Sequence, residues 1–343
     1  MLRKSLAVMA LLALAAAPGT AQEKEYEWSN DRPDAPAPSA LLGGQLLQGG
    51  QVEFGYRFHK MDFGDVRLGT DILDFFDVLA VYGGAPFGRT ETAHMFTFGY
   101  GLSDWLTLEA TAGWLVRDRE FGNETVFVDN NASGISDIEA AALVQIFDRD
   151  GIKAHLIGGV EIPTGSIEKV GPDLTGTNRL LAYEMQLGTG SFSVVPGAAA
   201  AIQNEKATVG AQVKARFRLL DNDRDYRYGD QFDGAMWASY MLNDNFAVTT
   251  GARFSKWGSI EGLDVGMDPA ADPGQDPFFS SGSRLDIPLG LNIHLTEGLL
   301  AGMDVAFEFL WPTYESYDAP RLEGEWGFNL SARRDITIPG LGN

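Results

Sequence analysis

The stretch TAHMFTFGYGLSDWLTLEATAGWLV, residues 92–116, decides the fold of this chain. Large apolar side chains alternate with small or polar ones on both sides of a short polar turn, Ser103-Asp104. Alternation with a period of two is typical of a strand with two unlike faces. Each arm runs about ten residues, the length that a tilted strand needs to cross a bilayer. A long hairpin in a soluble sandwich also alternates, so the rest of the chain must discriminate between the two folds.

The same alternation recurs along the chain and predicts about twelve strands. Besides the two arms of the hairpin, the expected strands are 51–59, 137–147, 153–162, 192–203, 209–218, 232–242, 246–255, 284–295, 303–309 and 325–333. The alanines of 137–147 would also suit a helix, and Pro196 weakens 192–203. A connection over 312–321, which begins at Pro312, is expected to join the last two strands.

The connections between these strands alternate between short turns and long loops. Outer-membrane barrels have this asymmetry, with tight periplasmic turns and longer outer loops, whereas a sandwich has no reason to separate loops by length. Closing the sheet also removes its edges, which matters where no water can satisfy the backbone. The sequence therefore predicts an all-β fold: a monomeric, transmembrane, antiparallel β-barrel of about 12 strands with short periplasmic turns and long outer loops.

The N-terminus MLRKSLAVMALLALAAAPGTAQ predicts an export signal. A short basic region, Arg3-Lys4, precedes an apolar run over 6–17, and small residues precede a cut at Gln22. We therefore expect residues 1–21 to be a cleaved signal peptide. The proline-rich segment 22–49 should lie outside the barrel wall, in the periplasm or tucked into the lumen, and a flexible leader is the favoured alternative. The barrel should span 50–336 and be followed by a tail over 337–343.

Charge and cysteine content exclude some classes of function. Removal of Arg3 and Lys4 leaves 24 of the 26 basic residues against 47 acidic ones. Such an acidic chain is not expected to bind nucleic acid. The chain has no cysteine, so an exported protein of this sequence does not rely on disulfides.

Charged side chains fall on the strand face opposite the apolar one, and in a barrel that face lines the lumen. Opposed acidic and basic lumen groups set the field and selectivity of pores. A structural barrel would instead pair these groups and close its lumen. The candidate lumen or selectivity residues are Arg57, Glu109, Glu139, Lys153, His155, Glu161, Lys214, Arg216, Arg218, Arg253, Arg284, Asp286, Asp304, Glu308 and Arg333.

The first long connection contains DILDFFDVLAVYGG, which predicts a short, very apolar helix. This segment fits a plug or a capture site for a hydrophobic solute, although an apolar loop lying on the membrane surface would look the same. The candidate capture or plug residues are Ile72, Leu73, Phe75, Phe76 and Leu79.

Neither a metal site nor an enzyme is expected. His59, His155 and His294 should face the lumen from strands that are not neighbours in a simple meander, whereas metal ligands must converge. His94 is the candidate base for a hydrolase on the outer wall, but no Gly-x-Ser-x-Gly accompanies it. We therefore expect no catalytic residue, no cofactor and no metal.

Several short sequence motifs resemble those of a known family. They are WSNDRPDAPAP (28–38), VEIPTGS (160–166), YEMQLGTGS (183–191) and a closing pattern of strand, Pro312, short connection and final strand. Together they resemble the outer-membrane transporter family named for the meta-cleavage pathway of phenol degradation, over most of the mature chain. The resemblance implies a channel for small, often aromatic or hydrophobic compounds.

The sequence thus favours a passive outer-membrane channel in a Gram-negative bacterium. The alternatives are a structural or adhesive barrel without an open pore and, less favoured, a barrel-wall hydrolase. The expected partners are outer-membrane lipid and lipopolysaccharide, a small hydrophobic or aromatic solute, and the barrel-assembly machinery.

Overall fold

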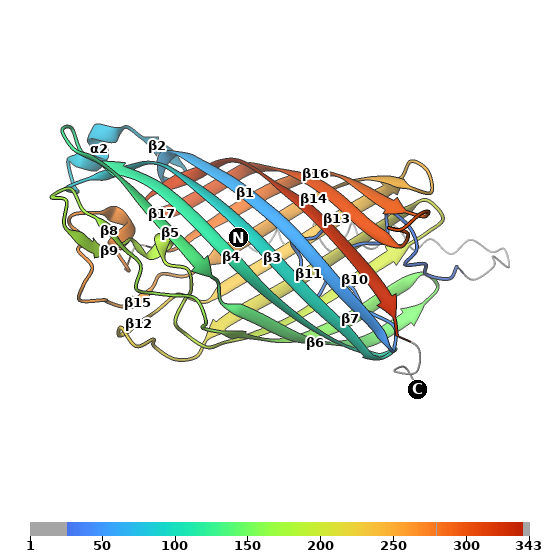
Figure 1. Ribbon diagram of the computed structural model, residues 1–343. Coiled ribbons are helices and arrows are strands. Elements are labelled where there is room, and N and C mark those ends of the chain that lie inside the picture. The colour runs from blue at the N-terminus through green and yellow to red at the C-terminus, as the bar shows by residue number, and fades with distance from the viewer. Residues whose placement is uncertain (1–25, 279, 339–343) are drawn as a thin grey trace, which may run out of the picture.

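A single closed antiparallel β-barrel makes up the wall of the molecule (Figure 1). The computed structural model describes residues 26–278 and 280–338, so the expected signal peptide and residues 339–343 of the expected tail lie outside the described part. The strands that close the ring are β1 (Gln51–Gly69), β3 (Ala85–Ser103), β4 (Leu106–Gly122), β6 (Ile138–Arg149), β7 (Ile152–Ile162), β10 (Ser193–Gln203), β11 (Ala207–Arg218), β13 (Gln231–Met241), β14 (Phe246–Trp257), β16 (Gly282–Leu295) and β17 (Met303–Thr337).

These eleven strand elements of the described chain build twelve positions in the wall, because β17 doubles back. Each neighbouring pair in the ring is antiparallel, and an odd number of strands cannot alternate in direction around a closed ring. The first arm of β17 pairs with β16 as far as Tyr317, and the arm that follows pairs with β1. Side chains connect the two arms: the rings of Phe309 and Trp326 stack 6.4 Å apart. The fold class expected from the alternation is confirmed.

The connection expected over 312–321 is longer than the one observed, because the first arm of β17 pairs with β16 through Pro312 to Tyr317 and the second arm already pairs with β1 at Arg321. Pro312 lies at a register shift, where Leu285 pairs with Tyr314 and Asp286 pairs with Pro312. A bulge of this kind accepts a proline that the ladder itself could not. Pro196 is similarly retained inside β10, opposite Gly158 of β7.

The long connections gather at one end of the barrel, which we call the long-loop end, and the short turns gather at the other, the short-turn end (Figure 1). Strands β1, β3 and β4 run further than the expected segments. At the long-loop end they are accompanied by β2 (Asp71–Leu73), α2 (Phe75–Leu79), β5 (Phe127–Ile135), β8 (Val170–Pro172), β9 (Asn178–Leu180), η1 (Tyr183–Met185), β12 (Tyr226–Arg227), β15 (Glu261–Gly262) and η2 (Pro273–Gln275).

The outer face of the wall is apolar. Side chains on the expected outward positions are exposed, among them Phe54, Phe96, Phe98, Leu108, Trp114, Leu156, Val213, Met236, Leu291 and Leu330. A closed barrel leaves no unpaired edge, so such a surface is suited to lipid. Within the described residues, no helix is long and apolar enough to cross a membrane.

Candidate functional site: the barrel lumen

Residues 26–49 lie inside the barrel at its short-turn end, and we call them the N-terminal plug. Of the two placements left open by the sequence, this is the lumen-tucked one, and it differs from the favoured flexible leader. The backbone N–H of Gly43 donates to Glu109 at 2.8 Å, and its carbonyl oxygen lies 2.8 Å from His155 Nε2. The backbone N–H of Leu47 donates to Thr107 Oγ1 at 2.9 Å. Three residues on two strands, β4 and β7, thus hold the plug's backbone.

An apolar patch on the lumen face receives the plug. Leu46 packs in a buried cluster with Leu143, Ile157 and Ala199, together with Ala141. Our sequence reasoning missed this patch, although a signal was present: in 140–144 both faces of the strand are apolar, so the alternation is lost. A strand that is apolar on both faces is typical of burial on both sides. One side is lipid, and the other is the plug.

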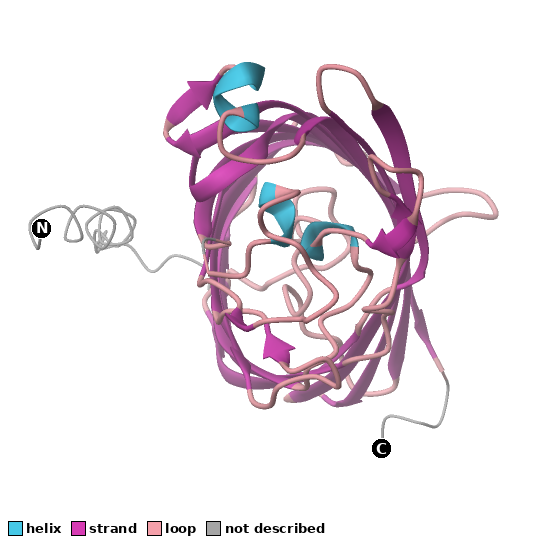
Figure 2. Cartoon of the chain, turned by 90° about the vertical axis from the view of Figure 1, so that its left-hand side faces the viewer, coloured by secondary structure: helices cyan, strands magenta, loops and turns pink. Residues whose placement is uncertain are grey.

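At the opposite end the long loops fold into the ring (Figure 2), and we call this set, residues 163–192, 219–230 and 258–278, the loop plug. Glu184, on η1, is its central anchor. The carboxylate lies 3.1 Å from Arg89, 3.4 Å from Arg119 and 3.5 Å from Arg321, which come from β3, β4 and β17. Arg119 also forms a bidentate pair with Asp272, at 2.6 and 2.7 Å. Buried ion pairs therefore fasten the loops to the wall.

Electrostatics keep this anchor charged. Burial alone would raise the pKa of Glu184, but the positive charges of Arg89, Arg119 and Arg321 outweigh it and lower the pKa to about 2. The loop plug also has apolar attachments: Leu181, Ala182 and Met185 pack with lumen-facing residues of the wall, including Leu115.

The two motifs with Pro-Thr-Gly and Gly-Thr-Gly meet at one carboxylate. Asp137 accepts hydrogen bonds from the N–H of Gly165 at 2.9 Å and from the N–H of Thr189 at 2.7 Å. A Cβ on Gly165 would lie 2.6 Å from Gly188 Cα, and a Cβ on Gly188 would lie 2.4 Å from Asp137 Oδ1. Two backbone segments cross here at a separation that only glycine allows. The crossing ties both ends of the loop between β7 and β10 to the wall.

Between the two plugs lies a chamber of about 650 Å³. Its lining runs from Ala40, Leu41 and Leu42 of the N-terminal plug to Tyr183 and Gln186 of the loop plug. Among the described residues that line it, eight are basic and six are acidic, in a chain whose formal net charge is −21. The basic ones are Arg57, Arg89, Arg117, Lys214, Arg216, Arg218, Arg253 and Arg321.

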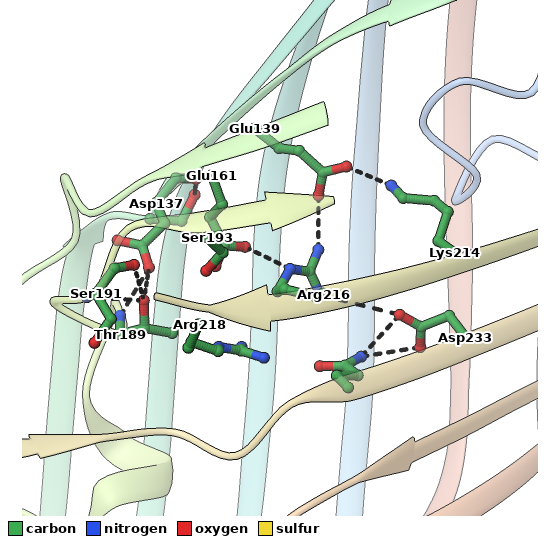
Figure 3. A network of polar contacts seen from close by, with 12 residues as sticks. Asp137, Glu139, Glu161, Thr189, Ser191, Ser193, Lys214, Arg216, Arg218 and Asp233 are labelled. Carbon is green, nitrogen blue, oxygen red and sulfur yellow. Dashed lines mark hydrogen bonds and ion pairs between the residues drawn. The ribbon is translucent and has the colours of Figure 1, made fainter. Parts of the chain in front are cut away.

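Ion pairs across the strands hold most of these charges in place, as Figure 3 shows for one wall of the chamber. Arg216 lies 2.7 Å from Glu139 and 3.0 Å from Glu161. Lys214 makes a short contact with the other oxygen of Glu139, and Asp233 is 4.0 Å from Arg216. The result is a rigid ladder of alternating charge rather than a set of free side chains.

The structure places the other candidate lumen residues on the inner face as well, in four further groups. Arg253 donates to Glu308 at 2.8 Å, and Arg284 donates to Asp286 at 2.7 Å. Arg333 is 3.3 Å from Asp304, which also lies 2.7 Å from His294. Lys153 and His155 border a small cavity beside the N-terminal plug, and Lys153 lies 5.5 Å from the ring of Trp28.

The apolar capture or plug candidates lie away from the lumen. Helix α2 is outside the opening of the ring (Figure 2), and none of its described residues borders the chamber. Leu73, Phe75 and Leu79 pack around a buried cluster that includes Val78 and Leu322 at the rim. Ile72 and Phe76 are exposed. This is a surface at the rim of the barrel, not a stopper in the lumen.

The histidines have separate partners. His59 Nδ1 lies 2.9 Å from Asn329 on the inner face. His94, on the outer face, lies 2.8 Å from the hydroxyl of Tyr56 and packs on Phe58. No serine contacts His94 in the described part of the chain.

A family model described as "Putative MetA-pathway of phenol degradation" matches residues 64–262. An outer membrane channel from Pseudomonas putida F1 has a similar structure, with a TM-score of 0.59 at 14% identity, over 88% of this chain and 100% of that one.

More distant structures are a KdgM porin and a Pseudomonas aeruginosa FadL homologue, each with a TM-score of 0.38. Their identities are 7% and 9%; the first match covers 82% of this chain and 98% of the porin, and the second 84% and 89%. No curated protein matches the sequence.

Proposed function

The chain belongs to the MetA-pathway family of phenol degradation, and we propose that it is an outer-membrane channel through which small hydrophobic or aromatic solutes diffuse passively. The observation that carries this proposal is the chamber of about 650 Å³ between the two plugs. Sites for small molecules have volumes of roughly 300–1,000 Å³ and combine apolar walls with a few fixed polar groups. The chamber has both, because Leu41, Leu42 and Met95 line it together with the charge ladder.

Passage through the barrel requires local movement of both plugs. Each plug is a non-wall segment held by discrete contacts, so it can leave while the hydrogen-bonded wall stays closed. A solute would move from the long-loop end into the chamber and then past residues 26–49. The short turns would face the periplasm, and the outer belt would contact lipid and lipopolysaccharide after insertion by the barrel-assembly machinery.

The test is single-channel recording of the refolded, full-length mature protein in a planar bilayer, with and without a neutral aromatic solute such as benzyl alcohol. We expect discrete conductance steps that the solute interrupts. A heat-modifiable barrel without steps would contradict an open channel. It would favour the second candidate, a structural barrel without a pore, for which the observation is that residues from both ends occupy the lumen.

The segment of β2 and α2 is proposed as a capture surface, because α2 lies outside the opening of the ring and Ile72 and Phe76 of this segment are exposed. Deleting residues 71–82 should lower the uptake of an apolar solute into liposomes and leave the heat-modifiable barrel intact. Equal uptake by the deletion and the full-length protein would remove the capture role.

A barrel-wall hydrolase is disfavoured by the surroundings of His94. Its contact is a tyrosine hydroxyl among aromatic rings, whereas a nucleophile would have to lie within hydrogen-bond reach of the base.

A further inference from the structure

Arg57 of β1 stands at the junction of two cavities. It lines the chamber and also a smaller cavity of about 110 Å³ enclosed by the N-terminal plug. Leu41 and Leu42 of the plug border both cavities as well. The guanidinium therefore borders both the chamber and the cavity that lies toward the short-turn end.

Arg57 differs from the other cations around it in having no partner. Among the described residues it makes neither a hydrogen bond nor an ion pair, whereas Lys214, Arg216 and Arg253 are each paired with a carboxylate. Arg218 does not pair with a carboxylate, but it donates to the carbonyl of Gly229 at 3.0 Å. Arg57 thus presents its N–H donors to the cavities uncommitted.

The carboxylate that acts electrostatically on Arg57, Glu308, is already hydrogen-bonded to other residues. Glu308 accepts from Arg253 at 2.8 Å and from Asn329 Nδ2, also at 2.8 Å. Arg57 and Arg253 both act electrostatically on Glu308, so two guanidinium charges share one buried carboxylate. This group lacks one negative charge, which a ligand could supply.

The surroundings of Arg57 also favour apolar contact. Met95 is its partner in the register between β1 and β3, and it lines the chamber. Leu41 and Leu42 lie on the side of the plug. A planar guanidinium beside thioether and leucine side chains matches a ligand with a carboxylate at one end and an apolar body at the other, because the guanidinium fork fits a carboxylate bidentately.

We propose that Arg57 binds the carboxylate of a small amphiphilic solute, an aromatic or short aliphatic monoacid, within the chamber. This inference names the solute class and rests on the proposed channel function. Neutral hydrocarbons would lack the interaction with Arg57, so the chamber would discriminate in favour of the acid.

The test compares benzoate with benzamide, a neutral molecule of similar shape, by calorimetric titration of the full-length mature barrel in nanodiscs. We expect the wild type to bind benzoate at least tenfold more tightly than benzamide. Arg57→Gln should weaken benzoate binding about tenfold and leave benzamide binding unchanged. Arg179→Gln, which removes an exposed arginine of β9 that does not line the chamber, is the matched control and should change neither.

Arg57→Lys keeps the positive charge but lacks the two-pronged guanidinium, so its affinity for benzoate should lie between those of the wild type and Arg57→Gln. Heat modifiability verifies that each variant is folded. The inference is overturned if Arg57→Gln binds benzoate like the wild type, or if the wild type binds the two molecules equally. Bilayer recordings distinguish the failure of the channel function from the failure of the Arg57 site. If benzoate binding depends on Arg57 but the barrel shows no conductance, the channel function is contradicted and the Arg57 site is supported.

Discussion

The two plugs occupy opposite ends of one lumen and are held by different chemistry. The N-terminal plug is attached through the apolar contacts of Leu46 and through neutral or single-charge hydrogen bonds such as that from Gly43 to Glu109. The loop plug adds a cluster of buried ion pairs around Glu184. Apolar packing is non-directional and insensitive to pH, whereas a buried ion pair fails when one partner is removed.

This difference indicates how each end could open. Leu46 can leave its patch without breaking an ion pair, so detachment of the N-terminal plug costs apolar contacts and single hydrogen bonds such as that to Glu109. Release of the loop plug would leave Arg89 and Arg321 facing each other without Glu184. The short-turn end is therefore the easier of the two to release, and the long-loop end is the more strongly locked.

The largest effect is expected from Glu184→Gln. Removing one partner of a buried ion-pair group destabilises by about 3–5 kcal/mol, because uncompensated charge stays behind. Amide hydrogen exchange of residues 181–187 should accelerate strongly, while residues 40–47 keep their protection. Glu168→Gln is the control, since that carboxylate is exposed and makes a single 3.4 Å contact with Arg224. Equal protection in both variants would show that the ion cluster does not lock the loops.

A somewhat smaller effect is expected from Leu46→Ala, at the other end. Truncating a buried leucine costs about 2–5 kcal/mol, and the plug can partly compensate through its backbone hydrogen bonds. Exchange of residues 40–47 should accelerate while residues 181–187 stay protected, and mean single-channel conductance should increase. Gln48→Ala serves as the control because Gln48 is exposed and lines neither cavity. If exchange accelerates at both ends, the two plugs unfold as one unit, and the claim that they are released independently is contradicted.

The smallest effect is expected from mild acidification. The pKa of Glu184, ordinarily 4.5, is lowered to about 2 by the surrounding arginines, despite its burial. A depressed carboxyl pKa contributes stabilisation that is complete above the ordinary pKa and is lost as the pH falls toward the lowered one. Loop protection, corrected for intrinsic exchange, should therefore stay constant from about pH 8 to about pH 5 and decline only below that range. A transition near pH 6.5 would assign the lock to a different group, such as a histidine.

Much of the wall could be predicted from the sequence, because alternation is a local property. Segments such as 153–162 and 246–255 became β7 and β14 with shifts of only one or two residues at their ends. The segment 137–147, which would also suit a helix, became β6, since only a strand can pair with both β4 and β7. The connection over 312–321 was predicted too long because a proline at a bulge, such as Pro312, cannot be distinguished locally from a proline in a loop.

The candidate site was predictable in kind but not in arrangement. The alternation of inward-facing and outward-facing side chains along each strand placed Glu139, Lys214 and Arg216 on the inner face. Their spacing in the sequence could not reveal that they form one network of ion pairs. The absence of a partner for Arg57 is equally invisible in the sequence, because it depends on Glu308 being occupied by residues of other strands.

The sequence by itself determined that this chain forms a closed barrel with an apolar outside and a charged inside, since period-two alternation and loop length are read within single segments. Only the tertiary structure decided what fills the lumen. The docking of Leu46 on Leu143 and Ile157, and the approach of Glu184 to arginines of three strands, join positions far apart in the chain. Such contacts depend on the register and closure of the whole ring, which no local pattern encodes.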